Sequence, residues 1–535
     1  MAAWSKLPTI TIQGSWEELF RTSGRCALDA LLPEYLRPRR WFGSKAATIR
    51  AATLREVVPI PCDDSRVFFN LVHVDFAYGE PELYALPLTL VSGSRAEAIQ
   101  PYAVLARAEG AAHGLLVDAL VEPSFSATLL EAIGGNRTFG SAHGEIRAGP
   151  TSHYAALRGP ASVPLVPKIN QAEQSNTSII FGDKLILKCF RRLQEGINPD
   201  LEVSSFLSRQ GFPHTAPVAG AIEFQPNSGK EPVTLAFLQA FVPNQGDAWQ
   251  YTLKELGQFH EAIRKQQIQV PETPPGHLLD LAQAEPSAVI RECLGPALDS
   301  ARLLGRRTAE LHLALAKGED PEFIPEPFTA QDQQSLYQSL SELYARAFAL
   351  LRSCVADLSP VVREDAVQVL ARSGTIPARL ECIVHGPLTG QRIRCHGDYH
   401  LGQVLFTGND FVIIDFEGEP ARPLAERRRK TSPLRDVAGM IRSFHYAAHS
   451  PLAEHGALPA PWAHFWYSWI SATFLQAYLA TMAAESILPR TRSELELLLD
   501  TFLLEKAMYE LAYELNHRPD WVGIPLRGID QLLGE

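Results

Sequence analysis

The pattern of hydrophobic and polar positions separates a strand-rich part of the chain from a helix-rich part. Short apolar runs at 67–76 and 83–91 predict strands, and a helical pattern over 15–32 precedes them. From residue 243 onward the spacing is mainly helical, and 465–484 predicts one long, largely apolar helix. The pattern therefore predicts an α+β fold with most of its helices in the C-terminal half.

A β-hairpin is predicted over 177–190, where two apolar runs flank a Gly-Asp turn. Lys188 lies in its second strand, and its long stem could carry the ammonium across apolar surface to the phosphates of a nucleotide. A helix start follows at Asn198, with Glu202 in its first turns and placed to pair with Lys188. Taken singly, Lys188 could also be an outward-facing strand lysine, and Glu202 a solvated helix-start carboxylate.

Residues 396–405 read His-Gly-Asp-Tyr-His-Leu-Gly-Gln-Val-Leu, and Asp415 ends a short apolar run ten residues later. This is the layout of a kinase-like catalytic loop followed by a metal-binding strand. Phosphoryl transfer needs a carboxylate that orients the attacking hydroxyl and oxygen ligands that hold Mg²⁺ against the phosphates of ATP. We assign Asp398 to the first role, and Gln403 and Asp415 to the second. The alternative is a hairpin turn followed by an ordinary buried strand.

The glycine-rich loop G-x-G-x-x-G of protein kinases is missing upstream of Lys188. In its place 171–177 is polar, and Ser175 and Asn176 offer donors to phosphate. This polar cover favours a small-molecule kinase over a protein kinase. The run 237–242 is predicted to end the lobe as a hinge where backbone groups bind adenine. The residues assigned to that contact are Gln239, Phe241 and Val242.

These motifs together resemble the maltokinases, which are relatives of aminoglycoside phosphotransferases. The resemblance rests on the runs S-N-T-S-I-I-F-G-D-K-L-I-L-K-C-F-R-R, I-N-P-D-L-E, H-G-D-Y-H-L-G-Q-V-L, D-F-E-G-E-P, R-R-K-T-S-P-L-R-D-V-A-G-M and the N-terminal W-F-G-S-K. Maltokinases transfer the γ-phosphate of ATP to the anomeric hydroxyl of maltose, and the maltose 1-phosphate feeds α-glucan (glycogen) synthesis. The resemblance implies the same reaction here, with ATP and Mg²⁺, in a bilobal protein-kinase-like fold.

The resemblance also implies three domains, and at 535 residues the chain is too long for a single core. An N-terminal cap is expected over 1–100. A β-rich, nucleotide-binding lobe is expected over 101–242, with a Gly- and Ser-rich surface loop at 134–152. A helical C-lobe with the catalytic loop and the sugar site is expected over 243–535.

The resemblance places a sugar-binding helix near the C-terminus. There Lys506, Tyr509 and Tyr513 recur at i, i+3 and i+7 and share a face, which offers hydrogen bonds and an aromatic platform to a sugar ring. The alternative is an ordinary amphipathic helix. A second interpretation is a kinase of the same fold that acts on glucosamine or an aminoglycoside, with Glu510 or Glu514 contacting the amine.

The composition of the chain indicates which classes of partner and which cellular compartment we expect. The chain is 46% hydrophobic and 20% charged, as ordinary soluble proteins are, and a net charge of −11 offers no broad basic surface to nucleic acid. Seven cysteines without C-x-x-C, and no apolar run after Met1–Lys6, predict reduced thiols in a cytoplasm. The stretch 465–484 is long enough to span a membrane, but Ser471, Thr473 and Gln476 within it favour a buried helix.

Assembly is the last expectation. Some maltokinase relatives are fused to trehalose synthase, so the resemblance implies possible association with that enzyme. A further alternative is a catalytically weak binding subunit of a glucan-synthesis complex. The intact set of Lys188, Asp398, Gln403 and Asp415 argues against that alternative.

Overall fold

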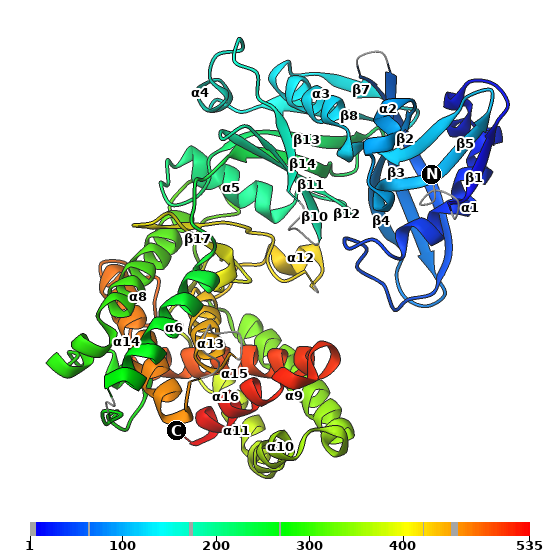
Figure 1. The fold of residues 1–535 in the computed structure, drawn as a ribbon. Coiled ribbons are helices and arrows are strands. Elements are labelled where there is room, and N and C mark those ends of the chain that lie inside the picture. Colours follow the sequence, from blue (N-terminus) through cyan, green and yellow to red (C-terminus); the bar gives the residue numbers. More distant parts are fainter. Residues whose placement is uncertain are drawn as a thin grey trace. The chain divides into compact units, whose positions relative to one another are not determined.

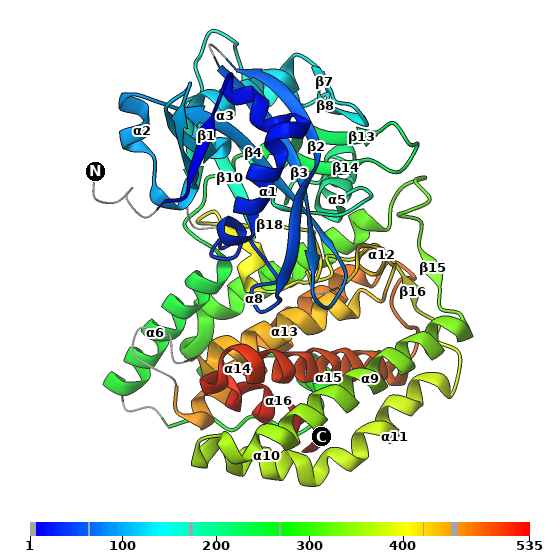
Figure 2. The ribbon, with the colours of Figure 1, turned by 90° about the vertical axis from the view of Figure 1, so that its right-hand side faces the viewer.

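The computed structural model of the chain describes residues 7–62, 65–170, 175–266, 269–420, 422–450 and 458–534. The chain divides into two compact units. The first unit comprises Met1–Ser208 and Ala216–Pro243, and the second comprises Arg209–Thr215 and Asn244–Glu535. Both large sheets belong to the first unit and the long helices to the second, so the fold is α+β, as predicted (Figures 1 and 2).

The first unit opens with a sheet of order β1-β5-β6-β4-β3-β2, to which β12 is added beside β4. Its strands are β1 (Thr9–Ile12), β2 (Ile49–Cys62), β3 (Ser65–Phe76), β4 (Glu82–Val91), β5 (Val104–Gly110), β6 (Gly114–Asp118) and β12 (Arg192–Leu193). The strands predicted over 67–76 and 83–91 are confirmed as β3 and β4. The sheet runs on to Asp118, beyond residue 100, where the sequence analysis placed the end of the cap.

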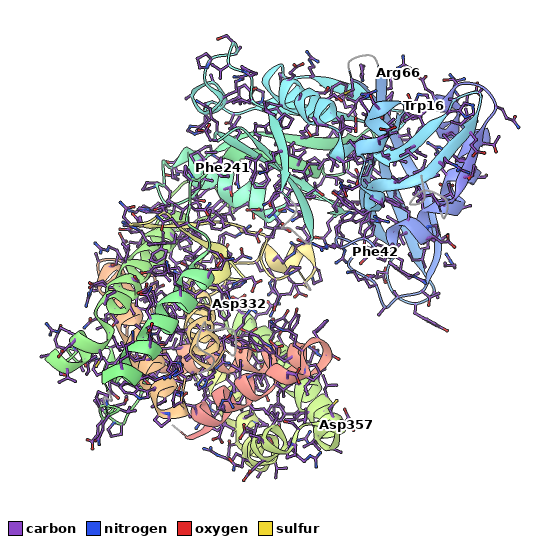
Figure 3. The ribbon with its side chains drawn as sticks, viewed as in Figure 1. Trp16, Phe42, Arg66, Phe241, Asp332 and Asp357 are labelled. Atoms are coloured by element: carbon purple, nitrogen blue, oxygen red, sulfur yellow. The ribbon has the colours of Figure 1, made fainter. Side chains whose placement is uncertain are left out.

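The helix predicted over 15–32 is divided in the structure. A 3-10 turn, η2 (Trp16–Phe20), ends where Arg21 takes an extended backbone, and α1 (Thr22–Leu36) then continues four residues beyond the predicted end. Its apolar residues pack with Phe42 and Tyr84 in the core of this sheet (Figure 3). The short elements α2 (Ser94–Ala98) and η3 (Pro101–Ala103) precede β5.

The second sheet of this unit is antiparallel throughout and has the order β7-β8-β13-β14-β11-β10-β9. Its strands are β7 (Thr138–Gly140), β8 (Gly144–Pro150), β9 (Pro167–Asn170), β10 (Asn176–Phe181), β11 (Leu185–Phe190), β13 (Val218–Pro226) and β14 (Val233–Ala240). The helical elements beside it are η4 (Ala119–Val121), α3 (Pro123–Gly134), α4 (Tyr154–Arg158) and α5 (Pro199–Arg209).

Two expectations about this sheet have different outcomes. The hairpin over 177–190 is confirmed as β10 and β11, and its turn uses Gly182 at φ +62°. The prediction of a loop over 134–152 is wrong, because much of that segment forms β7 and β8. β8 pairs with β13 along its whole length. The glycines of β8 favour a loop locally, but pairing with a distant strand makes this segment a strand.

The second unit is mainly helical. Its helices are α6 (Ala248–Gln266), α7 (Leu278–Leu281), α8 (Ala288–Leu315), α9 (Ala330–Cys354), α10 (Pro360–Arg372), α11 (Ile376–Glu381), α12 (Leu424–Arg427), α13 (Leu434–His449), α14 (Ala460–Met482), α15 (Arg492–His517) and α16 (Gly523–Gly534). The 3-10 turns are η5 (Val355–Asp357), η6 (Ser373–Thr375), η7 (Cys382–Val384), η8 (Leu401–Gln403) and η9 (Pro519–Trp521). Two small antiparallel pairs join β15 (Glu326–Pro327) to β16 (Gln391–Arg392) and β17 (Val404–Phe406) to β18 (Phe411–Ile413).

Helix α14 is the long apolar segment, and it is a buried helix, as predicted. It packs along α8 so closely that a Cβ at Gly305 would lie 2.2 Å from the carbonyl oxygen of Phe474. Helices α13 and α15 also lie side by side and carry side chains that become important below. In the described part of the chain, no helix has both the length and the apolar character that crossing a membrane requires.

Candidate active site

The segment that carries Asp398 lies between β16 and η8, and its conformation is held by Asp436 of α13. One carboxylate oxygen of Asp436 accepts a hydrogen bond from the backbone N–H of His396 at 2.7 Å. The other accepts from the N–H of Gly397 at 3.0 Å, where φ is +85°. Because two neighbouring backbone N–H groups donate to one buried carboxylate, these hydrogen bonds fix the conformation of the turn that carries Asp398.

Asp436 is itself held by His312 of α8. The His312 ring lies between the Tyr478 hydroxyl, 3.0 Å from Nδ1, and an Asp436 oxygen, 3.1 Å from Nε2, and all three side chains are fully buried. Burial favours the protonated form of Asp436, but the hydrogen bonds from His312 and the backbone keep its pKa below the ordinary value. His312 is therefore a structural histidine, as its place on an apolar helix indicates.

Asp398 contacts Lys506 of α15, with 3.0 Å between Oδ1 and Nζ. Burial opposes ionisation of Asp398, yet the Lys506 ammonium outweighs it, with help from the imidazoles of His400 and His396, and holds the pKa of Asp398 at about 2. Burial likewise disfavours the charged form of Lys506, while Asp398 raises the pKa of Lys506 above its ordinary value. Both groups therefore remain charged at neutral pH.

Asp398 and Lys506 line a pocket, which we call the Asp398 pocket, together with Tyr509 and a network of ion pairs. Arg422 binds Glu419 and lies 3.1 Å from Glu505, which also binds Arg435 at 2.7 Å. The pocket has a volume of about 30 Å³, so in this structure it has room for about one water molecule. A sugar ring would enter only if the ion pairs rearranged.

Gln403 and Asp415, the predicted metal ligands, meet beside the β17–β18 pair. The Gln403 side-chain N–H donates to Asp415 Oδ2 at 2.9 Å, and the N–H of Ile414 donates to the carbonyl of Gln403 at 3.0 Å. Asp415 has φ +67°, which L residues other than Asn and Asp rarely adopt. The amide group of Gln403 and the carboxylate of Asp415 are thus neighbours, and each carries a side-chain oxygen of the kind that Mg²⁺ prefers, so the chemistry of these residues fits the metal.

In the first unit, Lys188 of β11 is 9% exposed and lies 2.8 Å from Asp200 at the start of α5. We expected Glu202 to pair with Lys188; the contact that the structure gives is with Asp200, two residues earlier, and the pairing with Glu202 stays a prediction. Two residues turn a helix by about 200°, so Asp200 and Glu202 point to different sides of α5. Asn198 caps this helix through the N–H of Asp200 at 2.8 Å.

The remaining nucleotide-site residues are also in the first unit. Ser175 is exposed in a bend and Asn176 begins β10, whereas Gln171–Gln174 of the predicted phosphate cover lie outside the described residues. Gln239 is in β14, and the N–H of Phe241 donates to the carbonyl of Lys184 at 2.7 Å (Figure 3). The last member, Val242, follows immediately. Their contacts with a nucleotide stay predictions.

The predicted sugar face of α15 is only partly assembled. Tyr509 reaches the Asp398 pocket, with the Lys506 ammonium 5.1 Å from its ring centroid. Tyr513, one turn further on, is 42% exposed and stacks on His517. The two carboxylates suggested for an amine are engaged elsewhere. Glu510 pairs with Arg442, and Glu514 pairs with Arg518.

Sequence reasoning gave no role to several residues that shape this site: Glu419, Arg422, Arg435, Asp436 and Glu505. The signal was present in part, because the run containing Arg435-Asp436 contributed to the family resemblance. Nothing in the local spacing, however, indicates that α13 and α15 deliver these groups to one pocket.

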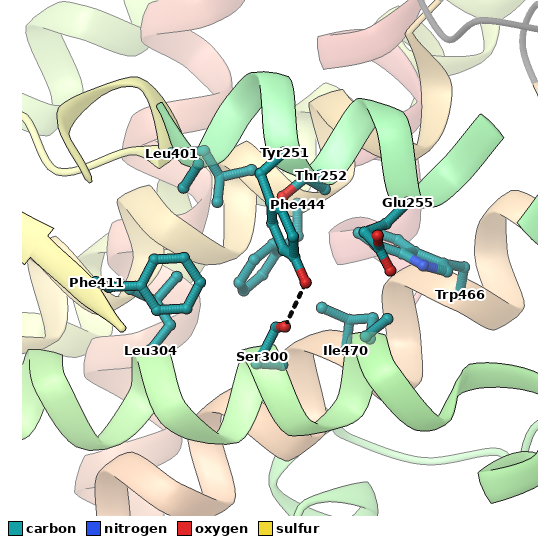
Figure 4. A pocket seen from close by; sticks show the side chains of 13 residues that line it. Tyr251, Thr252, Glu255, Ser300, Leu304, Leu401, Phe411, Phe444, Trp466 and Ile470 are labelled. Atoms are coloured by element: carbon teal, nitrogen blue, oxygen red, sulfur yellow. Dashed lines mark hydrogen bonds between the residues drawn. The ribbon is translucent and has the colours of Figure 1, made fainter. Parts of the chain in front are cut away.

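A second cavity lies behind the catalytic segment, between α6, α8 and α14 (Figure 4). Leu401, Phe411 and Trp466 contribute apolar lining, and the polar lining consists of Thr252, Glu255 and the pair Tyr251 and Ser300, whose hydroxyl groups lie 2.9 Å apart. Its volume is about 30 Å³, the size of a water site. We attribute it to imperfect packing beneath the loop.

Comparison with known proteins agrees with this geometry. Residues 35–121 match the model of the maltokinase N-terminal cap domain, and residues 168–418 match the model of the phosphotransferase enzyme family. A glucosamine kinase of Streptacidiphilus jiangxiensis is 26% identical over 373 residues, which cover 68% of this chain and 72% of that protein. A glucosamine kinase of Mycolicibacterium smegmatis is 26% identical over 368 residues, which cover 68% and 78%.

Solved structures are similar in fold. A glucosamine kinase in complex with glucosamine, ADP and inorganic phosphate superposes with a TM-score of 0.60 at 20% identity, covering 97% of this chain and 100% of that one. A second crystal form of glucosamine kinase gives the same TM-score. The α+β fold is therefore kinase-like, with the additional N-terminal cap that the sequence predicts. The chain combines a maltokinase-type N-terminal cap with a domain of the phosphotransferase enzyme family.

Proposed function

We propose that the protein is an ATP-dependent sugar kinase that phosphorylates maltose at its anomeric hydroxyl, giving maltose 1-phosphate and ADP. The observation that carries this proposal is the contact of 3.0 Å between Asp398 and Lys506 at the wall of a pocket, on a segment that Asp436 fixes. A positioned carboxylate beside a cation is what a phosphoryl acceptor site needs.

Asp398 orients the acceptor hydroxyl. The hydroxyl oxygen attacks the γ-phosphorus, and the bond from that phosphorus to the β–γ bridging oxygen breaks, which releases ADP. The hydroxyl proton is transferred to the carboxylate of Asp398. With a pKa of about 2, Asp398 is a weak base, which suits a loose transition state in which the proton is lost late. Lys506 keeps Asp398 ionised and limits its rotation, so that one hydroxyl among many is selected by position.

On the nucleotide side, Lys188 contacts the phosphates of ATP, and Asp200 holds its ammonium in place. Ser175 and Asn176 donate hydrogen bonds to the phosphates, and the segment of Gln239, Phe241 and Val242 contacts adenine. Gln403 and Asp415 would hold Mg²⁺, which when bound neutralises charge on the β- and γ-phosphates.

Maltose is favoured by the cap domain and by the charges of the pocket. Four carboxylates line the pocket, and within the described residues three of them have a cationic partner in its wall. The pairs are Asp398 with Lys506, Glu419 with Arg422, and Glu505 with Arg435, while Asp436 accepts hydrogen bonds from two backbone N–H groups. A neutral sugar needs no free carboxylate and can use hydroxyl hydrogen bonds and the Tyr509 ring, whereas an ammonium group that bound Asp398, Glu419 or Glu505 would have to displace a cation.

Glucosamine is the second candidate, because two curated relatives and the similar solved structures are glucosamine kinases. In that case Glu419 or Glu505 would release Arg422 and accept the amine, since Glu510 and Glu514 are paired outside the pocket. A catalytically weak binding subunit is disfavoured by the assembled Asp398–Lys506 and Lys188–Asp200 contacts.

The test is an ATP-consumption assay over maltose, glucose, glucosamine and trehalose, with each product identified by NMR. We expect maltose to give the highest kcat/KM and a product with phosphorus coupled to the anomeric carbon. Faster turnover of glucosamine, or a product phosphorylated at C6, would replace maltose by the amino sugar. Failure of every sugar to stimulate ATP consumption would overturn the proposed activity.

The setting of the reaction is part of the same proposal. Maltose 1-phosphate would feed α-glucan (glycogen) synthesis in the cytoplasm, and a maltose-producing enzyme such as trehalose synthase would supply the acceptor. A pull-down with trehalose synthase, followed by activity measurements on trehalose, tests that coupling directly.

A further inference from the structure

A cavity of about 350 Å³ lies inside the first unit, and we call it the cap cavity. Its lining comes from both sheets: the segment after α1, the region before β5 and the end of β6 on one side, and the ends of β9, β10 and β11 on the other. The strand β12 continues directly from β11 and pairs with β4 of the first sheet, so both walls belong to one connected structure (Figure 1). The volume is within the range of about 300–1,000 Å³ that small-molecule sites occupy.

Arg191 is the most unusual group in this lining. It is 3% exposed, binds Asp118 at 2.6 Å, donates to Thr177 at 2.8 Å and places its guanidinium 4.9 Å from the centre of the Trp41 ring. Its Nη1 is nevertheless buried without a hydrogen-bond partner among the described residues. An unsatisfied buried donor on a charged group is costly, so it indicates that a ligand or water completes the site.

The charge of the cavity indicates the sign of the ligand. Among the described residues that line the cavity, three are cationic, Arg39, Arg40 and Arg191, and one is anionic, Asp118. Asp118 is neutralised by Arg191 and also accepts from the N–H of Leu120, so among these residues the charge of Arg39 and Arg40 is in excess. Guanidinium groups offer the paired donors that match a phosphate group.

Aromatic rings supply the rest of the wall. Tyr35, Trp41 and Tyr102 line the cavity, and Tyr102 is 49% exposed although it is large and mostly apolar. Flat amphipathic rings beside arginines suit a ligand with a phosphate at one end and a ring at the other. We propose that the cap cavity is a binding site for a small phosphomonoester of a sugar.

Among the hairpin residues that line the cap cavity, Thr177 lies on the face opposite Lys188, whereas Asn176 lies on the same face as Lys188. Lys188 pairs with Ser178, and Cys189 pairs with Thr177, so side chains alternate between the two faces. Arg191 donates to Thr177 and therefore belongs to the second face. Because Arg191, whose Nη1 lacks a partner among the described residues, belongs to the face opposite Lys188, we infer that the ligand is an effector or a retained product and is distinct from the nucleotide that Lys188 is proposed to bind. Because binding is measured without turnover, this inference can be tested whether or not maltose is the acceptor.

The test is isothermal titration of the full chain with glucose 1-phosphate, inorganic phosphate and glucose, in the presence of saturating ADP and of the acceptor sugar that the substrate assay identifies, which together occupy the catalytic sites. We expect glucose 1-phosphate to bind one site, more tightly than phosphate, and glucose to bind much more weakly. Arg40→Glu should weaken the binding of glucose 1-phosphate roughly tenfold or more. Arg37→Glu is the matched control, because it reverses an exposed charge three residues away that does not line the cavity, and it should change binding less than about twofold.

Two further variants separate the parts of the site. Trp41→Ala should remove the advantage of glucose 1-phosphate over inorganic phosphate, because the ring wall is lost while the guanidinium groups remain. Arg191→Lys retains the charge but removes the unpaired Nη1; if its melting temperature falls sharply, Arg40→Glu alone decides. Equal effects of Arg40→Glu and Arg37→Glu, or no saturable binding of either phosphate compound, would overturn the proposal.

Discussion

The ammonium nitrogen of Lys506 lies 3.0 Å from a carboxylate oxygen of Asp398, although 108 residues separate them in the sequence. Burial alone would raise the pKa of Asp398, and the ammonium reverses that effect and holds the pKa at about 2. Asp398 is therefore ionised at neutral pH, and in the orienting role that we propose for it, it is a weak base because of its neighbour.

Lys506→Met should move the acidic limb of the pH profile of kcat/KM to higher pH. The variant removes the charge that lowers the pKa of Asp398 but leaves the burial that raises it, so the limb should shift from about pH 2 to above about pH 4. Catalysis at neutral pH should fall roughly tenfold or more, because a hydrogen bond to a charged group contributes about 1.5–3 kcal/mol. Lys506→Arg retains the charge and is the control; its acidic limb should stay low. If the acidic limb of the pH profile were unchanged in Lys506→Met, Lys506 would not be the group that lowers the pKa of Asp398 during catalysis.

Asp398→Asn should lower kcat by ~10²–10⁴-fold with little effect on the affinity for ATP. The amide keeps the shape of the carboxylate but cannot take the proton, and the backbone contacts from Asp436 are untouched. The measurement is kcat together with ATP binding by equilibrium titration. Turnover close to that of the unchanged protein would remove Asp398 from its assigned role.

Asp415→Ala should abolish activity, whereas Gln403→Ala should mainly raise the Mg²⁺ concentration needed for half-maximal rate. A carboxylate is the stronger ligand for a hard cation, and the neutral amide is the weaker one. The hydrogen bond between them at 2.9 Å means that either change also frees the other side chain, so melting temperatures are the necessary control. If Gln403→Ala had the same Mg²⁺ requirement as the unchanged protein, the amide would not be a ligand.

Local spacing in the sequence located much of the candidate site. Asp398, Gln403 and Asp415 lie on one continuous segment with a short hairpin, so their proximity depends on few long-range contacts. The β10–β11 hairpin was equally local, and its turn glycine was visible. Local spacing did not indicate that Asp200 contacts Lys188, because the same motif offers both Asp200 and Glu202 and the contact with Asp200 depends on how α5 packs against β11.

Contributions from distant helices could not be predicted in the same way. Asp436 and Glu505 reach the Asp398 pocket because α13 and α15 pack side by side, and a helical pattern does not specify its partner helix. For β7 and β8 the sequence predicted a loop, and the structure has strands. Their glycines favour a loop locally, and pairing with β13, far away in the sequence, makes β8 a strand.

Asp436→Asn should loosen the backbone of the segment that carries Asp398 and should lower the stability of the second unit. An asparagine retains one acceptor oxygen but turns its NH₂ toward a backbone N–H, so one of the two donors from His396 and Gly397 loses its partner. A buried unsatisfied group costs about 1–3 kcal/mol, so the melting temperature should fall by several degrees. The kcat should fall with the KM for ATP nearly unchanged. A normal kcat in a folded Asp436→Asn protein would show that the loop does not need this anchor.

Tyr509→Ala should raise the KM for the sugar well before it changes the KM for ATP, and Tyr513→Ala should not. The two tyrosines lie one turn apart on α15, and the family resemblance implies that both contact the sugar. In the structure Tyr509 lines the Asp398 pocket beside Lys506, whereas Tyr513 is 42% exposed and stacks on His517. Each change removes one ring from the same helix, so the pair is matched in chemistry and differs in location. The measurement is a steady-state series with maltose and ATP both varied. Equal increases in the maltose KM would mean that the sugar extends along α15 beyond the pocket, and an increase with Tyr513→Ala alone would place the acceptor one turn further along α15, outside the Asp398 pocket.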